Sequence, residues 1–128
     1  MRLLLDTHAF IWLNSAPEKL SIRVRDCCEQ GTAHFYLSLV TPWEMQIKRS
    51  LGKLRSEPVA ARVLRANLDH NNINLLPIKL AHVERLAQLP MHHRDPFDRM
   101  LIAQAGTEGM TLVSADQSFA AYEVPVLW

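Results

Sequence analysis

Cysteine is scarce in this sequence, which has 128 residues and only two cysteines, Cys27 and Cys28. They are adjacent, and neighbours on a helix point in different directions, so an unstrained disulfide between them is not expected. Their spacing also differs from that of a zinc site, in which paired cysteines are separated by other residues. We therefore expect two small, buried or half-buried side chains in a protein that an apolar core stabilises.

Long apolar runs are lacking as well. No segment approaches the roughly 20 apolar residues that a membrane-spanning helix needs. The N-terminus, MRLLLDTHAFIWL, has one basic residue and a short apolar run, but Asp6 and His8 interrupt that run and no small-residue cleavage site follows. These absences argue against membrane and secreted proteins, and we expect a single cytoplasmic domain over residues 1–128.

Short apolar strands alternate with helical patterns along the chain. Strands are predicted at 2–5, 34–39, 73–78, 111–114 and 124–128. Helices are predicted at 7–13, 21–30, 41–52, 59–69, 80–89 and 96–109, with a short one after Asp116. This alternation predicts an α/β fold with a mostly parallel central sheet of about five strands and helices on both faces.

Two of these helices share a start signal, namely a capping residue, a proline and an acid in the first turn. The sequence TPWE, which begins at Thr41, predicts Thr41 as the N-cap and Glu44 as the acid of a capping box. The sequence DPFD, which begins at Asp95, predicts Asp95 as the N-cap. Asp98, three residues later, faces the positive end of the helix dipole, so we assign capping to Asp95 and metal binding to Asp98.

Four acidic residues stand where a predicted strand ends or a predicted helix begins: Asp6, Glu44, Asp98 and Asp116. In open α/β sheets functional groups gather at the carboxyl ends of the strands, so all four can converge there. Converging carboxylates repel one another and need a cation, and an all-oxygen set suits Mg²⁺ or Mn²⁺ rather than zinc. Taken singly, each acid has a structural alternative as a helix cap or as a partner of a helix dipole.

Net charge is only +1, but basic residues are concentrated in one stretch. Residues 48–65 hold six lysines and arginines against a single glutamate. A cation-filled acidic site beside such a stretch suits a polyanionic substrate, and a bound metal activates water for phosphodiester hydrolysis. We take Lys48, Lys53 and Arg55 as weak candidates for RNA contacts; the alternative, which charge alone favours, is an ordinary solvated helix face.

Four blocks of the sequence, in their order and spacing, resemble the PIN domain: LLLDTHAFIWL, TPWEMQIKRSLGKL, HHRDPFDRMLIAQA and LVSADQSF. More narrowly, they resemble the VapC toxins of VapBC toxin–antitoxin pairs. The resemblance implies a five-stranded parallel sheet and endoribonuclease activity that depends on Mg²⁺, with Mn²⁺ as a substitute. It also implies a cognate antitoxin at the active-site groove. We further expect RNA as the substrate and a homodimer.

The resemblance also implies the site residues. Its acidic positions, which serve both catalysis and metal binding, fall on Asp6, Glu44, Asp98 and Asp116, and none of the four is replaced. Ser114 matches a hydroxyl position beside the last acid. We expect Thr7 and Arg99 to support the acids as well, although Arg99 has the alternatives of a phosphate contact and a surface salt bridge.

Other functions remain open. A PIN nuclease of RNA processing without a toxin role carries the same acids, and a non-catalytic RNA-binding module predicts lost acids, although none is lost. Phosphatases that form a phosphoaspartate need a second aspartate two positions after the nucleophile, and here that position is His8. His92 and His93 suggest a second metal site with Asp95, but a polar loop that leads into a capped helix is favoured.

Overall fold

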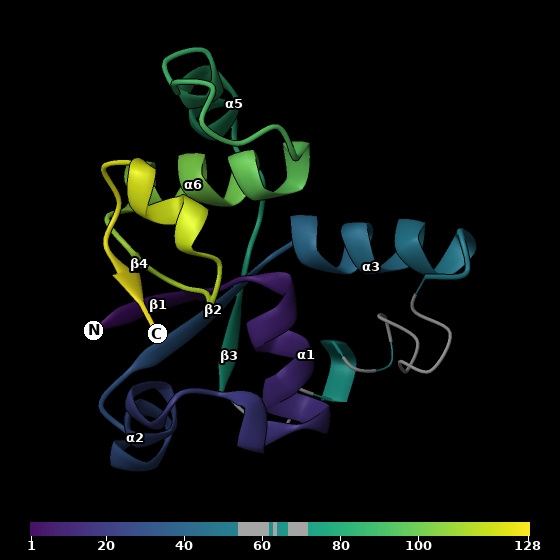
Figure 1. The fold of residues 1–128 in the computed structure, drawn as a ribbon, viewed down its shortest axis with the longest axis vertical. Coiled ribbons are helices and arrows are strands. Elements are labelled where there is room, and N and C mark those ends of the chain that lie inside the picture. The colour runs from purple at the N-terminus through teal and green to yellow at the C-terminus, as the bar shows by residue number, and fades with distance from the viewer. Residues whose placement is uncertain (54–61, 63, 67–71) are drawn as a thin grey trace.

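A five-stranded, all-parallel sheet forms the centre of the computed structural model, which describes residues 1–53, 62, 64–66 and 72–128 (Figure 1). The strands are β1 (Arg2–Leu5), β2 (His34–Ser38), β3 (Ile73–Leu76), β4 (Thr111–Val113) and β5 (Val126–Leu127). Their order across the sheet is β3-β2-β1-β4-β5, and every neighbouring pair is parallel. The predicted α/β fold is therefore confirmed.

Helices cover both faces of this sheet. They are α1 (Thr7–Ser15), α2 (Ile22–Gln30), α3 (Val40–Ser50), α5 (Leu80–Leu86) and α6 (Pro96–Glu108), with the 3-10 helices η1 (Pro17–Lys19) and η2 (Gln117–Ala121). Most of the helix predicted at 59–69 lies outside the described residues. Among the described residues, no helix is both long and apolar enough to span a membrane.

The central strand β1 separates two apolar cores. Leu3 and Leu5 point to one face and pack in a cluster with Phe10 of α1, whereas Leu4 points to the other and packs in a cluster with Leu101 of α6. Alternation along a strand sends successive side chains to opposite faces, so three consecutive leucines anchor both layers. Each fully buried leucine contributes about 1.5–3 kcal/mol to stability. Figure 1 shows α1 and α6 on opposite sides of the sheet.

The strand order reverses between β1 and β4, because β2 and β3 lie on one side of β1 and β4 and β5 on the other. In open α/β sheets ligands bind at the carboxyl ends of such a strand pair. Asp6 directly follows β1, and Ser114 directly follows β4. The Asp6 N–H donates to the Val113 carbonyl at 3.1 Å, so the two loops begin side by side.

The start of α3 differs from the prediction. This helix begins at Val40 with Leu39 in the N-cap position, so Thr41 is a helical residue and its assignment as the N-cap is wrong. Ser38 explains the earlier start, because its Oγ accepts a hydrogen bond from the Val40 N–H at 3.1 Å. Among the described residues, the buried hydroxyl of Thr41 has no hydrogen-bond partner.

Several other elements are shorter than predicted, since β2, β4 and β5 lie inside the predicted ranges 34–39, 111–114 and 124–128. β3 ends at Leu76 instead of residue 78, because Pro77 follows and has no N–H to continue the ladder. Helix α5 ends at Leu86 rather than at residue 89. All these differences lie at element ends, and they leave the carboxyl edge of the sheet as predicted.

Candidate active site

Asp6 caps α1 and is buried, with 6% of its surface exposed. Its Oδ1 accepts a hydrogen bond from the Ala9 N–H at 2.7 Å, so the helix-cap alternative is realised. Burial raises the pKa of Asp6 above its usual value, hydrogen bonds from Ser114 and Ala9 oppose this shift, and the charge of Glu44 adds to it. Asp6 is therefore a carboxyl group with too little positive charge around it.

Glu44 lies in the first half of α3 and is 3% exposed. The Thr7 hydroxyl donates to Glu44 Oε1 at 2.8 Å, and the Lys48 ammonium group forms an ion pair with Oε2. The carboxylate therefore turns toward α1 and toward the next turn of its own helix, not back to its own N-terminus as a capping box requires. The predicted contact of Thr7 with an acid is confirmed.

Asp98 lies in the first turn of α6, three residues after Asp95. Asp95 Oδ1 accepts hydrogen bonds from the N–H groups of Phe97 (2.8 Å) and Asp98 (3.1 Å), which confirms Asp95 as the N-cap. The pKa of Asp98 is raised to about 7, because the carboxyl group is partly buried and the charges of Asp95, Glu44 and Asp6 add to this effect, against the lowering effect of His93. Asp95 and Asp98 are close in sequence but differ in role, because Asp95 caps α6 whereas Asp98 is partly buried among other acids.

Asp116 follows β4 and caps η2, where its Oδ1 accepts a hydrogen bond from the Ser118 N–H at 2.9 Å. Ser114 Oγ accepts a hydrogen bond from the Asp116 N–H at 3.0 Å and so holds the backbone of this turn. Partial burial raises the pKa of Asp116, but the hydrogen bonds from Ser118 and His93 outweigh it, and the pKa is lowered overall. Ser114 therefore touches both ends of the site, Asp6 and Asp116.

His93 connects the acids of two separate segments. Its Nε2 lies 3.2 Å from Asp98 Oδ2 and 3.4 Å from Asp116 Oδ2. Ligand atoms of these three residues all lie within 4.8 Å of one another. The charges of Glu44 and Asp6 also raise the pKa of Asp98, so these two acids lie near it. The structure therefore brings the four predicted acids to one place. Sequence reasoning did not assign His93 to this site.

Among the described residues, no hydrogen bond or ion pair joins Arg99 to one of the four acids. Its Nη1 donates to the carbonyl of Pro90 at 2.9 Å and its Nη2 approaches those of Leu86 and Leu89, so the guanidinium group binds the backbone of the loop after α5. Successive residues on a helix point in different directions, which explains why Arg99 faces away from Asp98. Its Nη1 also approaches the His93 carbonyl at 3.5 Å and the Tyr122 hydroxyl at 3.4 Å, so among the described residues Arg99 is linked to the acids only through the loop that carries His93.

The basic candidates on and after α3 have different surroundings. The Lys48 ammonium group pairs with Glu44, and the charges of Asp95 and Asp98 also raise its pKa although burial lowers it. Lys53 is exposed beyond the end of α3, and Arg55 lies outside the described residues. Lys48 thus belongs to the acidic site itself, whereas a contact of Lys53 with RNA stays a prediction.

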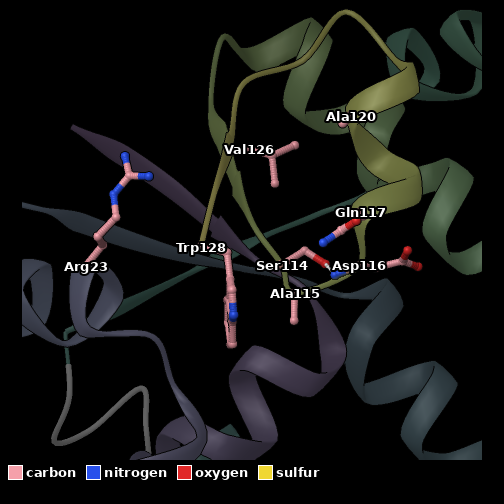
Figure 2. A pocket seen from close by; sticks show the side chains of 8 residues that line it. All are labelled: Arg23, Ser114, Ala115, Asp116, Gln117, Ala120, Val126 and Trp128. Carbon is pink, nitrogen blue, oxygen red and sulfur yellow. Dashed lines mark hydrogen bonds between the residues drawn. The ribbon is translucent and has the colours of Figure 1, made fainter.

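A pocket of about 480 Å³ opens beside Asp116. Figure 2 shows it with Arg23 of α2 and Asp116 at opposite ends and the Trp128 indole between them. Gln117 and Ser114 contribute to the same lining. A cationic side chain, an aromatic ring and an amide therefore lie next to one of the four acids.

These side chains fit a hard divalent cation. Four carboxylates supply oxygen ligands, which Mg²⁺ and Mn²⁺ prefer. Burial and mutual repulsion raise the pKa values of Asp6 and Asp98, so both gain from added positive charge. Within the described residues, Lys48 and His93 pair with these acids, Thr7 and Ser114 donate hydrogen bonds to them, and His8 lies near Asp6.

Comparison with known proteins identifies the family and the fold of the chain. A family model described as PIN domain matches residues 3–125 of the chain. No curated protein matches it.

Several solved structures share the fold at low identity. VapBC2 from Rickettsia felis, bound to a promoter DNA fragment, has a TM-score of 0.73 at 14% identity and covers 99% of this chain and 98% of its own. FitAcB from Neisseria gonorrhoeae has a TM-score of 0.65 at 22% identity, covering 98% and 96%. VapBC-5 from Mycobacterium tuberculosis, a member of the VapBC family of toxin–antitoxin systems, has a TM-score of 0.59 at 19% identity, covering 98% and 95%.

Proposed function

This chain belongs to the PIN domain family, as the match over residues 3–125 shows, and we propose that it is a metal-dependent endoribonuclease that acts as a VapC-type toxin. The observation that carries this proposal is the convergence of four carboxylates from four separate segments at the switch point of the sheet. A structural role does not require so many like charges in one place, because each added acid costs stability.

Mg²⁺, or Mn²⁺ in its place, is the cation that we propose for this site, held by Asp6, Glu44, Asp98 and Asp116. When bound, it lowers the pKa of a coordinated water and stabilises charge on the leaving oxygen of a phosphodiester. The chain itself holds three of the acids in fixed orientations: Thr7 donates to Glu44, Ser114 hydrogen-bonds Asp6, and the Ser118 N–H donates to Asp116. The site is therefore largely preorganised.

The pocket beside Asp116 supports a nucleic acid substrate. Proteins that bind single strands combine cationic side chains with aromatic rings on which bases stack. Arg23 and Trp128 provide one of each in the pocket that Asp116 also lines, with Arg23 at the end away from Asp116 (Figure 2). We propose that a nucleotide adjoining the cleaved bond occupies this pocket.

The toxin role is supported by the names of the similar structures, which are toxin–antitoxin complexes such as VapBC. We propose that a cognate antitoxin binds this chain and that the chain forms a homodimer. Induced expression is expected to arrest bacterial growth, and co-expression of the antitoxin is expected to restore it. Growth that continues unchanged in the native host contradicts the toxin role and leaves a nuclease of RNA processing.

Cleavage of a structured RNA by the purified protein tests the nuclease. We expect cleavage with Mg²⁺ or Mn²⁺, none in EDTA, and none for Asp6→Asn, which keeps the shape of the side chain but removes its charge. Asp26→Asn, the same change at an exposed position of α2, is the matched control and is expected to cleave normally. Full activity in EDTA would falsify the metal-dependent mechanism, and RNA binding without cleavage favours the non-catalytic module.

A further inference from the structure

The imidazole ring of His93 lies inside the acidic site, yet the proposed chemistry does not use it. Its Nε2 lies 3.2 Å from Asp98 Oδ2 and 3.4 Å from Asp116 Oδ2, and 17% of its side chain is exposed. Asp98 belongs to α6, whereas Asp116 follows β4. The ring therefore bridges two acids that the chain delivers from separate elements.

The hydrogen bonds of the ring define which nitrogen carries its proton. Nδ1 accepts a hydrogen bond from the Asp95 N–H at 3.1 Å. In a neutral imidazole one nitrogen accepts and the other donates, so the proton lies on Nε2. A histidine that ligates a metal instead donates from its other ring nitrogen. His93 is thus arranged to donate Nε2–H to the two carboxylates, and its bonding at Nδ1 is the reverse of that of a metal ligand.

The ring is also fixed in place by residues far away in sequence. It stacks on Phe119, with the ring centres 5.7 Å apart and the planes at 18°. The His93 backbone N–H donates to Tyr122 Oη at 2.8 Å. Both contacts come from the segment after Asp116, so the structure that places His93 also places one of the acids it contacts.

The geometry points to His93 as a positioning residue, which holds the carboxylates of Asp98 and Asp116 together and so prepares them to share one divalent cation. This inference rests on the metal site of the proposed function. Without a donor between them, two like charges from different elements move apart. Among the described residues, no other side chain forms a hydrogen bond with the carboxylate of Asp98.

Mn²⁺ binding to the full chain without RNA, measured by titration calorimetry, tests this role. His93→Phe keeps a ring to stack on Phe119 but removes both nitrogens, and we expect about tenfold weaker Mn²⁺ binding, as for other residues that orient metal ligands. His93→Gln retains an N–H donor near the position of Nε2 and is expected to restore most of the affinity. His92→Phe is the matched control, because His92 packs against Tyr122 and touches neither acid.

Thermal unfolding shows whether each variant remains folded. Unchanged or tighter Mn²⁺ binding by folded His93→Phe overturns the inference. It is also overturned if His93→Gln is folded but binds Mn²⁺ as weakly as His93→Phe. A directly bound ¹⁴N in the electron-spin-echo spectrum of the Mn²⁺ complex overturns it too, since His93 is then a ligand. If the wild type binds Mn²⁺ but cuts no RNA, the proposed nuclease fails while the positioning role stands; if it binds no Mn²⁺, both fail.

Discussion

Two histidines of this protein each accept a backbone N–H at Nδ1, but their Nε2 atoms face different numbers of acids. His82 Nδ1 accepts a hydrogen bond from the Lys79 N–H at 3.0 Å, as His93 Nδ1 does from the Asp95 N–H at 3.1 Å. Nε2 of His82 lies 2.8 Å from one carboxylate, that of Glu108. Nε2 of His93 faces two carboxylates, those of Asp98 and Asp116. Two further acids, Glu44 and Asp6, lie near enough to raise the pKa of Asp98.

The difference separates a cluster with balanced charges from the cluster that we propose as the active site. His82 is fully buried and joins α5 to α6 through a single carboxylate, that of Glu108. The hydrogen bond from His82 and the nearby Lys79 lower the pKa of Glu108, so that carboxylate is fully compensated. At His93 the acids outnumber the donors, and the pKa of Asp98 is raised to about 7. An excess of acid that the fold retains despite its cost is what the proposed cation site requires.

The largest expected effect comes from the same change made in each cluster. Asp98→Asn removes one charge from the overfilled site and is expected to abolish RNA cleavage while the protein remains folded. Glu108→Gln removes one charge from the compensated pair and is expected to leave cleavage unchanged. Cleavage assays with circular dichroism on both variants measure this, and equal loss of activity in the two breaks the comparison.

Asp95 sharpens the same test, because it lies three residues before Asp98 and only caps α6. Asp95→Ser keeps a capping oxygen and is expected to retain cleavage with little change in stability. Asp95→Ala loses the cap and is expected to lower the free energy of unfolding by about 0.5–2 kcal/mol. An inactive Asp95→Ser together with an active Asp98→Asn means that the two roles are reversed.

Removal of each ring gives the next largest contrast. His82→Ala leaves a cavity in a fully buried position and leaves the Lys79 N–H without its acceptor, so we expect a loss of roughly 3 kcal/mol in the free energy of unfolding. His93→Ala is expected to cost clearly less, because that ring is partly exposed. Urea unfolding of both variants measures the difference. If the costs are equal, His93 is as structural as His82.

The sequence predicted the acids but not the ring between them. Asp6 and Asp116 follow apolar strands, and Asp98 follows a proline and a cap, so short-range signals were sufficient to place them. His93 lies in a loop without periodicity, and its direction depends on Phe119 and Tyr122, which are distant in sequence.

Two differences from the sequence predictions have the same origin. Arg99 points to the carbonyls of the loop after α5, and a sequence pattern does not reveal that loop's position. The pattern TPWE predicts Thr41 as the cap, yet Ser38 provides the acceptor for the first turn and the helix begins earlier. Competition between neighbouring polar residues decides such a start, and the pattern alone does not rank the competitors.

The pH dependence of stability should also differ between the clusters. The folded pKa of Asp98 lies above its unfolded value, so the folded state binds more protons between about pH 4 and 7 and loses stability as pH rises through this window. Glu108 has a lowered pKa, so its contribution is present at neutral pH and is lost as pH falls below the unfolded value.

Melting temperatures in EDTA at pH 4.5 and pH 8 measure this contrast. Relative to the wild type, Asp98→Asn is expected to be more stable at pH 8 and nearly equal at pH 4.5, because the amide removes the repulsion that ionisation creates. Glu108→Gln is expected to be less stable at pH 8, with a smaller difference at pH 4.5. A destabilised Asp98→Asn at pH 8 means that the acid is compensated after all.

The smallest expected effects come from the lysine in each cluster. Lys79 lies 3.4 Å from Glu108 and is largely exposed, so Lys79→Met is expected to change stability by less than about 1 kcal/mol and to leave Mn²⁺ binding unchanged. Lys48→Met removes a positive charge from among Glu44, Asp95 and Asp98, so Mn²⁺ binding is expected to tighten several-fold while RNA binding at low salt weakens. Calorimetry with Mn²⁺ and a salt titration with RNA separate the two effects. If Mn²⁺ binds less tightly to Lys48→Met, the ammonium group organises Glu44 instead of standing in for the cation, and the site has less excess charge than the comparison requires.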